Sequence, residues 1–491
     1  MSEYKTPGVY VVEKDAFPNS VVEVPTAVPA FIGFTQKAMR GTSSLLNTPT
    51  RITSFAEFEI LFGVAPPLSV VADANDASAF LRDGIFILHQ SMKFFYDNGG
   101  GPCYIVSIGD YSTASPTSDM FTAGIDTLTA EQEPTMVVTP ETCLMGLSDW
   151  SKVAQHALLH CQTMQSRVAV LDLWHGNYGL GPLVAPADAP VSNFRSNIGT
   201  VGLNYGCAYY PWLNTSILEQ PAVTFMNLSD DLRKTLSEAV TKEQTAIYAA
   251  KAGAPDVPAD LSGYLKDVKD GTASPTGHAA LMTISPLYKQ YMVAALAAVN
   301  VMPPSAGMAG VITRTDNTSG VWQAPANTSM MDVVSPCVNI THDQQEDLNM
   351  PLNGLAVNAI RSFINRGVLV WGARTLDGNS QDWRYISVRR TLIMLEQSAK
   401  AACDAYVFAP NDAGTWSTVK AMLENFLTNQ WKAGALAGTK PADAFSVDVG
   451  LNATMTGNDI LDGYMRVTIK VAVTHPAEFI VLTFQQQMQK S

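Results

Sequence analysis

Runs of apolar residues along the chain predict strands, and two of these runs lie near the N-terminus. Gly8–Glu13 and Ala30–Phe34 are rich in β-branched and aromatic residues. Between them, Pro18, Pro25 and Pro29 interrupt regular structure. The first run has no hairpin partner beside it in the sequence. We therefore expect it to pair either with a remote part of its own chain or with another chain.

Further along, strand-like and helix-like patterns alternate from about residue 130 to 215. Such alternation predicts a parallel or mixed sheet flanked by helices, so the expected fold class is α/β, or mixed α+β. Residues 215–285 are more polar and predict a helical insertion on that scaffold. The expected strands are Thr135–Thr139, Arg167–Leu173 and Tyr205–Pro211, and the expected helices are Asp149–Gln165, Asp230–Ala252 and Ala259–Lys269.

The remaining pattern predicts helices and strands on both sides of this region. Ser54 stands at an N-cap with Glu57 at capping-box spacing. Near the end, polar and apolar residues alternate over Met465–Val473, which predicts a strand with one buried face. The other expected helices are 54–62, Ala79–Asn98, Leu355–Arg366, Ile386–Tyr406 and Thr415–Ala433, and the other strands are Cys103–Ile108, Gly367–Trp371 and Glu478–Phe484.

The composition indicates a globular chain with little charge. At 491 residues it is long enough for two or three domains, and 47% of it is hydrophobic. Charged residues make up only 15%, against roughly 25% in typical soluble domains. Either the interior is large, or much of the surface is covered by partners.

The charge is unevenly distributed along the chain. The formal net charge of −13 argues against a general nucleic-acid coat. Residues 351–491 hold 13 Lys and Arg against 11 Asp and Glu, whereas the first 350 residues hold 18 against 33. The last part is therefore locally basic.

Six scattered cysteines without a C-x-x-C pair predict reduced, mostly buried thiols rather than disulfides or a zinc site. The start lacks a basic and then apolar signal region, and the apolar stretch 291–301 is too short to cross a bilayer. We expect the protein to be made and folded in a cytoplasm.

No catalytic motif stands out. Gly434–Pro441 approaches a phosphate-binding loop but is one residue short and follows a helix instead of preceding one. His156 and His160 lie four residues apart on a predicted helix, so either they share a metal site or they are ordinary surface or packing residues. The second interpretation is preferred because the H-E-x-x-H glutamate is absent. We expect no enzyme activity, no cofactor and no metal.

A series of short motifs, in a fixed order, is similar to the contractile tail sheath protein family. None of these motifs identifies the family alone, but their shared order over 1–110 and 285–491 does. Residues 111–284 match only in their coarse α/β pattern. The motifs are Thr6–Glu13, Pro303–Gly310, Arg314–Asp316, Gly320–Asn327, Leu352–Asn353, Asn358–Arg361, Val370–Leu376, Trp383–Arg390, Ala409–Asp412, Thr415–Trp416, Phe426–Trp431, Gly434–Gly438 and His475–Phe479.

The resemblance implies a division into five parts. The fold would be a C-terminal sheath domain, completed by the N-terminal segment, with an inserted α/β outer domain. The parts are a strand-donating arm and linker (1–28), the N-terminal part of the sheath core (29–110), the outer domain (111–340) with a variable insertion at about 215–285, the inner sheath domain (341–465), and the C-terminal strands and extension (466–491).

The resemblance also implies a structural function. The subunit would form stacked hexameric rings around an inner tube and contract to drive the tube through a target envelope, in a phage tail or a single-use injection particle. Its partners would be other copies of itself, the tube, the baseplate and terminal cap proteins, with no direct nucleic acid and only indirect membrane contact. The strands donated between subunits would comprise Val9, Tyr10, Val11, Val12, Phe479, Ile480, Val481 and Leu482.

A basic cluster is the second feature to which the resemblance gives a role. Six arginines stand against two acids over residues 361–390. By analogy, the long helix that begins at about 386 would meet an acidic inner tube, and we assign Arg389, Arg390 and Lys400 to that contact. Arg374 and Arg384 are assigned to ion pairs within the subunit. The alternatives to a sheath subunit are an α/β-domain enzyme, a tube or baseplate component, and another self-assembling shell protein.

Overall fold

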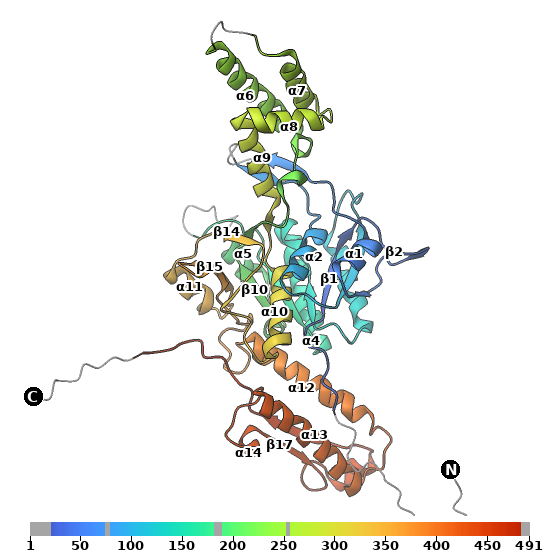
Figure 1. The fold of residues 1–491 in the computed structure, drawn as a ribbon. Helices are drawn as coiled ribbons and strands as arrows, with labels where there is room; N and C mark the ends of the chain where they lie inside the picture. The colour runs from blue at the N-terminus through green and yellow to red at the C-terminus, as the bar shows by residue number, and fades with distance from the viewer. Residues whose placement is uncertain (1–20, 74–78, 181–188, 252–255, 483–491) are drawn as a thin grey trace, which may run out of the picture. The chain divides into compact units, whose positions relative to one another are not determined.

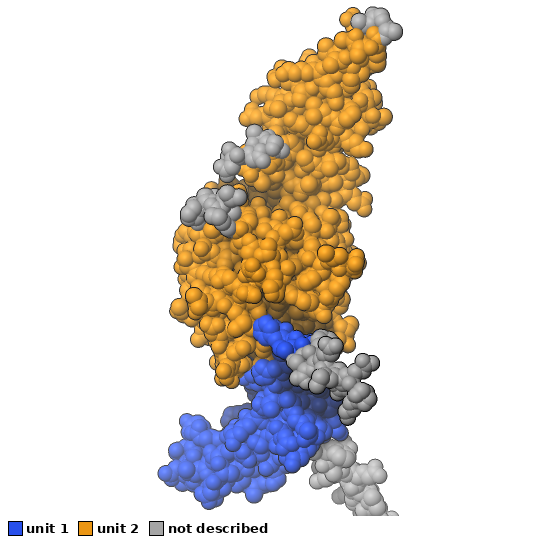
Figure 2. All heavy atoms as spheres, turned by 90° about the vertical axis from the view of Figure 1, so that its left-hand side faces the viewer, with its two compact units in different colours: residues 1–24, 391–491 blue, residues 25–390 orange. Residues whose placement is uncertain are grey.

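The computed structural model describes residues 21–73, 79–180, 189–251 and 256–482. The chain divides into two compact units (Figure 2). Unit 1 comprises residues 1–24 and 391–491, and unit 2 comprises residues 25–390. The polypeptide therefore passes from one unit to the other twice, after Val24 and after Arg390.

Unit 2 is built on a nine-stranded mixed sheet with the order β13-β16-β15-β10-β9-β8-β1-β7-β4. Figure 1 labels three of these strands, β1, β10 and β15. The six strands from β15 to β7 run parallel, and antiparallel strands flank them on both sides. This arrangement confirms the predicted α/β fold class. The strands are β1 (Pro29–Thr35), β4 (Thr50–Ile52), β7 (Cys103–Asp110), β8 (Met136–Val138), β9 (Val168–Asp172), β10 (Gly206–Tyr210), β13 (Thr328–Ser329), β15 (Asn358–Phe363) and β16 (Gly367–Val370).

Helices cover both faces of this sheet. On β1, the ring of Phe31 packs edge-on against Phe95 of α2, with centroids 5.0 Å apart. The ring of Phe34, three residues on and so on the opposite face, packs in the same way against Phe121 of α3. Every residue of β1 is buried as a result. The helices around the sheet are α1 (Phe55–Phe62), α2 (Leu88–Asp97), α3 (Ser118–Thr127), α4 (Leu147–Met164), α5 (Pro190–Asn197), α10 (Ser305–Ser319) and α11 (His342–Asn349).

A second hydrophobic core in unit 2 belongs to the helical insertion. Leu232, Leu236 and Val240 of α6 pack in it with Leu261 and Leu265 of α7. The predicted insertion at 215–285 therefore contains helices, and α9 extends the cluster to Val299. Its elements are α6 (Asp230–Ala249), α7 (Ala259–Asp270), α8 (Pro275–Ile284), α9 (Pro286–Val299), β5 (Val70–Ala72) and β6 (Phe80–Arg82).

Smaller elements complete unit 2. A three-stranded sheet contains β11 (Leu213–Thr215), β12 (Val301–Met302) and β14 (Val333–Pro336), and a small hairpin contains β2 (Met39–Arg40) and β3 (Ser43–Ser44). The 3-10 turns are η1 (Leu128–Ala130), η2 (Thr142–Leu144), η3 (Leu203–Tyr205), η4 (Gln220–Ala222) and η5 (Phe225–Asn227).

Unit 1 contains most of one long helix, a second long helix and a two-stranded sheet. Helix α12 runs over Ile386–Asp404, and its first residues belong to unit 2. Helix α13 (Ala413–Ala433) begins at the N-cap Asp412 and ends at Gly434, whose φ of 96° is strained for residues other than glycine. The remaining elements are α14 (Pro441–Ala444), β17 (Phe445–Val449), α15 (Gly457–Leu461) and β18 (Val467–Val471).

Two predicted helices are wrong in part or entirely. Within the predicted helix 79–98, only the second half is helical. Residues 80–82 instead pair with β5, and Gly84 then takes a φ of 88°. Of 355–366, none is helical: residues 358–363 form β15, which lies between β10 and β16. In both cases pairing with another strand overrides the local helical pattern.

The predicted N-cap of α1 is confirmed. The Oγ of Ser54 accepts a hydrogen bond from the backbone N–H of Glu57, at 3.2 Å. The Glu57 carboxylate does not complete a capping box, because it accepts from the N–H and hydroxyl of Thr53 instead.

Candidate assembly site

The two-stranded sheet of unit 1 has unpaired edges. Strands β17 and β18 are antiparallel and fully in register from Phe445↔Val471 to Val449↔Val467. Among the described residues, no third strand pairs with either of them. Helix α13 packs against β17, whereas the side chains of β18 are at least partly exposed. Two strands alone form a marginal sheet, and unpaired edges attract further strands.

The apolar positions of β18 are less covered than the sequence predicts. Val467, Ile469 and Val471 alternate with polar residues, as expected for a strand with one buried face. Ile469 nevertheless remains 37% exposed. The prediction of a buried face is therefore wrong for the subunit by itself.

After β18 the chain continues as an exposed apolar tail, defined here as residues 474–482. A single bridge joins Val473 to Leu436, and beyond it the chain has no regular structure. The predicted strand over 478–484 is thus absent from the described residues 478–482. Four consecutive apolar side chains are 66–87% exposed: Phe479, Ile480, Val481 and Leu482.

The last part of the N-terminal arm and linker contacts both long helices of unit 1. The backbone N–H of Val24 donates to the Oγ of Ser398 on α12, at 3.1 Å. The side-chain amide of Gln430 on α13 donates to the carboxylate of Glu23, also at 3.1 Å. Residues 23 and 24 are thereby attached within unit 1, while the predicted donor strand Val9–Val12 lies outside the described residues.

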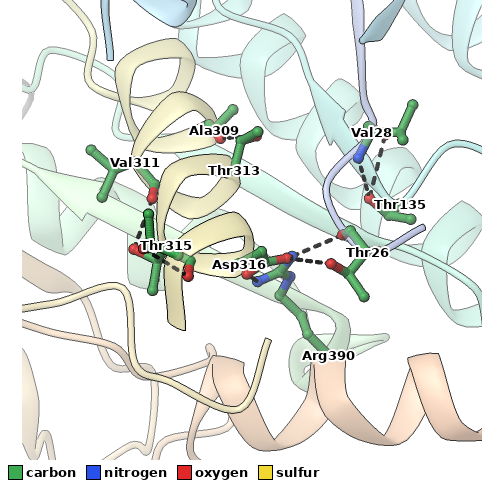
Figure 3. A network of polar contacts seen from close by, with 10 residues as sticks. Thr26, Val28, Thr135, Ala309, Val311, Thr313, Thr315, Asp316 and Arg390 are labelled. Carbon is green, nitrogen blue, oxygen red and sulfur yellow. Dashed lines mark hydrogen bonds and ion pairs between the residues drawn. The ribbon is translucent and has the colours of Figure 1, made fainter. Parts of the chain in front are cut away.

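A buried ion pair in unit 2 lies next to the two points where the chain passes from one unit to the other, after Val24 and after Arg390 (Figure 3). Arg390 donates to the two carboxylate oxygens of Asp316 at 2.9 and 2.5 Å, and both side chains are 3% exposed. Arg390 also donates to the carbonyl oxygen of Thr26, and the Thr26 hydroxyl donates to Asp316. Asp316 lies on α10, so one helix position fixes Thr26 and Arg390 together.

The other end of α10 is also held by a buried carboxylate. Asp172, at the end of β9, accepts hydrogen bonds from the backbone N–H and the hydroxyl of Ser305, the first residue of α10. A carboxylate at a helix N-terminus is favourable because it binds unpaired N–H groups and meets the positive end of the helix dipole. Burial nevertheless raises the pKa of Asp172 to about 7.

A further buried carboxylate joins three elements of unit 2. Glu141, just after β8, accepts from the backbone N–H groups of Phe34, Ile87 and Leu88 at 2.8–3.0 Å. It thereby connects the end of β1 to the start of α2. Burial raises its pKa to about 8, although the three donors act in the opposite direction.

Known proteins resemble this chain at three levels. A family model, the phage tail sheath C-terminal domain, matches residues 379–487. A tail sheath protein of Vibrio phage KVP40 is 26% identical over 129 residues, which are 26% of this chain and only 19% of that protein. The PVC sheath complex of an extracellular contractile injection system, in its contracted state, matches over 99% of both chains with 25% identity and a TM-score of 0.62.

These matches support the contractile tail sheath family for this chain. It is a subunit of a contractile sheath, and the resemblance predicted from its ordered motifs is confirmed. The anti-feeding prophage baseplate, 6-fold symmetrised, also matches, over 99% of this chain and 100% of that chain, with 26% identity and a TM-score of 0.61. The family is structural. None of the helices in the described part of the sheath subunit combines the length and apolar character that a bilayer crossing requires.

Two of the three residues assigned to the tube are buried in the sheath subunit. Arg389 is 3% exposed; its guanidinium lies over the rings of Tyr205 and Trp383 and donates to the Tyr205 hydroxyl. Arg390 is 4% exposed and is held by Asp316. Neither side chain lies on the surface in this conformation, so the tube assignment of both needs correction. Lys400 is exposed.

The two histidines considered for a metal site have different partners. His156 contacts Asp126 at 2.7 Å, whereas His160 is buried beside Arg167, and burial lowers its pKa to about 4. Arg374, assigned to an ion pair, is buried and donates to backbone carbonyls of Asn349 and Gly378. Within the described ranges, no group of three or more His, Cys, Asp or Glu side chains is placed to hold a metal ion.

Strand β17 was missed by the sequence analysis. Its residues Phe445-Ser-Val-Asp-Val449 alternate between apolar and polar, so a period-two search would have found it. Without β17 the open sheet could not be predicted, because β18 then had no partner.

Proposed function

We propose that this sheath subunit polymerises as stacked six-membered rings around an inner tube and contracts to drive the tube through a target envelope. The observation that carries this proposal is the incomplete sheet of unit 1. It has two five-residue strands, and the same unit carries four exposed apolar residues, Phe479–Leu482, that form no strand.

Strand donation between subunits completes this sheet. The tail residues 479–482 of one copy add to an edge of β17–β18 in a neighbour, and the arm residues Val9–Val12 of another copy add to the other edge. Main-chain hydrogen bonds supply the strength of such contacts, and burial of Ile469 and the tail side chains adds a hydrophobic contribution. Because each contact is head-to-tail, it propagates into an open helical lattice.

Contraction in this scheme needs no cofactor. An extended lattice of higher free energy rearranges to a contracted one once the baseplate releases it. Donated strands keep neighbours connected while the rigid parts of each subunit move. The partners proposed are further copies of the chain, the inner tube, the baseplate and a terminal cap, with assembly in a bacterial cytoplasm before the particle acts.

For the tube contact we retain only Lys400 of the three residues assigned from the sequence. Its ammonium is exposed on α12 and can meet an acidic partner over a long range. For Arg389 and Arg390 we propose a different role, as anchors of the first turn of α12.

The test uses single prolines within the donated segments. Val11→Pro and Val481→Pro each remove one backbone N–H without disturbing the described core, so folded subunits that no longer form striated cylinders are expected in electron micrographs. Val11→Thr and Val481→Thr, which keep that N–H and a β-branched side chain, are the matched controls. Normal cylinders from both proline variants would contradict strand donation.

A further inference from the structure

The hairpin β15–β16 carries a rigid group of arginines and aromatic rings at the surface of unit 2. The rings of Phe363 and Trp371 lie 4.5 Å apart between centroids. The guanidinium of Arg366 lies 5.8 Å from the first ring and 5.5 Å from the second, and that of Arg361 lies 5.5 Å from Phe363. Cation–π contacts of this kind fix the direction of an arginine without neutralising its charge.

Both arginines are held by neutral partners. Arg361 donates to the side-chain carbonyl of Gln345 at 2.5 Å, and Arg366 donates to that of Asn327. Among the described residues, neither forms an ion pair. The nearby helix α11 does carry carboxylates, but Asp347 is engaged by Arg195 at 2.7 Å. Two positive charges are therefore oriented and left without a counter-charge.

The tip of the hairpin projects an apolar side chain beside these charges. Ile364 is 92% exposed. Asn365 and Gly367, with φ of 61° and 74°, make the tight connection between the strands. Strand β13, the neighbour of β16, is only two residues long and pairs with Leu369 and Val370. The tip therefore extends beyond the last paired residues of the sheet.

We propose that this hairpin is an interaction surface for a second copy of the chain, with Arg361 and Arg366 binding exposed carboxylates and Ile364 entering the contact. Charge complementarity favours this partner, since residues 25–390 hold 31 Asp and Glu against 22 Lys and Arg. An excess of carboxylates on each copy meets an uncompensated positive site on the next. The inference rests on the proposed self-assembly, but it concerns unit 2 and not the donated strands.

The first experiment reverses the two charges. Arg361→Glu/Arg366→Glu is expected to weaken association between full-length chains about tenfold or more, as measured by sedimentation in low salt. Lys37→Glu/Arg40→Glu, which makes the same change in net charge at two exposed residues on and beside the hairpin β2–β3, should leave association unchanged. Arg361→Gln/Arg366→Gln, which removes charge without reversing it, should give an intermediate loss. If the charge reversal on β15–β16 and the control reversal at Lys37 and Arg40 weakened association equally, the proposal would be overturned.

The second experiment identifies the partner directly. A photo-crosslinking amino acid at position 364 should produce covalent dimers of the chain, joined to a peptide that contains Asp or Glu. Crosslinks to the inner tube alone, or none, in wild-type-like cylinders would overturn the assignment of this surface while leaving the proposed function intact. Dimers crosslinked through position 364 in a protein that never forms cylinders would contradict the proposed function and leave the surface intact.

Discussion

The large sheet of unit 2 ends in short strands, whereas the small sheet of unit 1 ends in strands as long as any it contains. At the edges of the large sheet lie β4, with three residues, and β13, with two. In unit 1 both β17 and β18 have five residues and an edge without a partner among the described residues. Short edge strands protect a sheet against further pairing, and long ones invite it.

Burial shows the same difference between the two sheets. Phe31, on an inner strand of the large sheet, is fully buried, while Ile469 on β18 is 37% exposed. Unit 2 therefore completes its core within one chain. Unit 1 retains surface that only additional strands would cover, which is the property expected of the part of a subunit that joins its neighbours.

The most direct test of this difference in burial is to truncate one apolar side chain in each sheet. Phe31→Ala should lower the free energy of unfolding by about 3–5 kcal/mol, because it leaves a cavity beside Phe95. Ile469→Ala should cost less than about 1 kcal/mol in the dilute subunit, since water already reaches this side chain. Urea denaturation measures both. Equal losses of unfolding free energy from the two substitutions would mean that β18 is covered in the isolated subunit.

The same Ile469→Ala substitution should weaken the assembled lattice more than it weakens the subunit. The heat or denaturant needed to dissociate cylinders should fall, because the alanine buries less apolar surface against donated strands. Cylinders as resistant as wild type would indicate that no strand packs on this side of β18.

Breaking the buried ion pair between Arg390 and Asp316 should lower the free energy of unfolding about as much as Phe31→Ala does. Arg390→Met leaves the Asp316 carboxylate buried without its cation, so a loss of about 3–5 kcal/mol in unfolding free energy is expected. The double variant Arg390→Met/Asp316→Leu should recover much of that loss. If the single and double variants unfold alike, the pair contributes no coupling and does not anchor the chain.

A pH dependence confined to unit 2 is also expected. Burial raises the pKa values of Glu141 and Asp172 to about 8 and 7, above those in the unfolded chain. The folded state therefore binds more protons than the unfolded state over this range, and stability should fall as the pH rises from about 4.5 to 8. Each group contributes at most about 1.4 kcal/mol per pH unit. In urea titrations, Glu141→Gln should flatten this slope; an unchanged slope would show that Glu141 does not titrate there.

Much of the fold could be predicted because local signals agreed with the final structure. Strand β1 and helices α4 and α13 have continuous or amphipathic patterns and clear ends, such as Gly434 after α13. Strands β6 and β15 could not be predicted in this way. Their extended conformation depends on pairing with other strands: β6 pairs with β5, about ten residues earlier, and β15 pairs with β10, about 150 residues earlier.

The candidate site was predictable in outline but not in its charged residues. Exposure of Phe479–Leu482 agrees with a segment that needs a partner. The polar positions at the start of α12 suggested an exposed basic face, yet Arg390 is satisfied by Asp316, 74 residues earlier, and by Thr26, 364 residues earlier. Helical spacing shows which residues share a face of a helix, but not which remote carboxylate covers that face.

Helix α10 has one consequence for how the subunit bears mechanical load. Near one end, Asp316 secures Thr26 and Arg390; at the other, Ser305 is secured by Asp172 at the end of β9. Its 15 residues span about 22 Å. Tension on either of the two connections between the units would therefore act on helix α10. It would be transmitted along this helix to β9, in the centre of the large sheet. Under the proposed strand donation, loads on the two chain connections would therefore meet at one helix that is anchored in the large sheet.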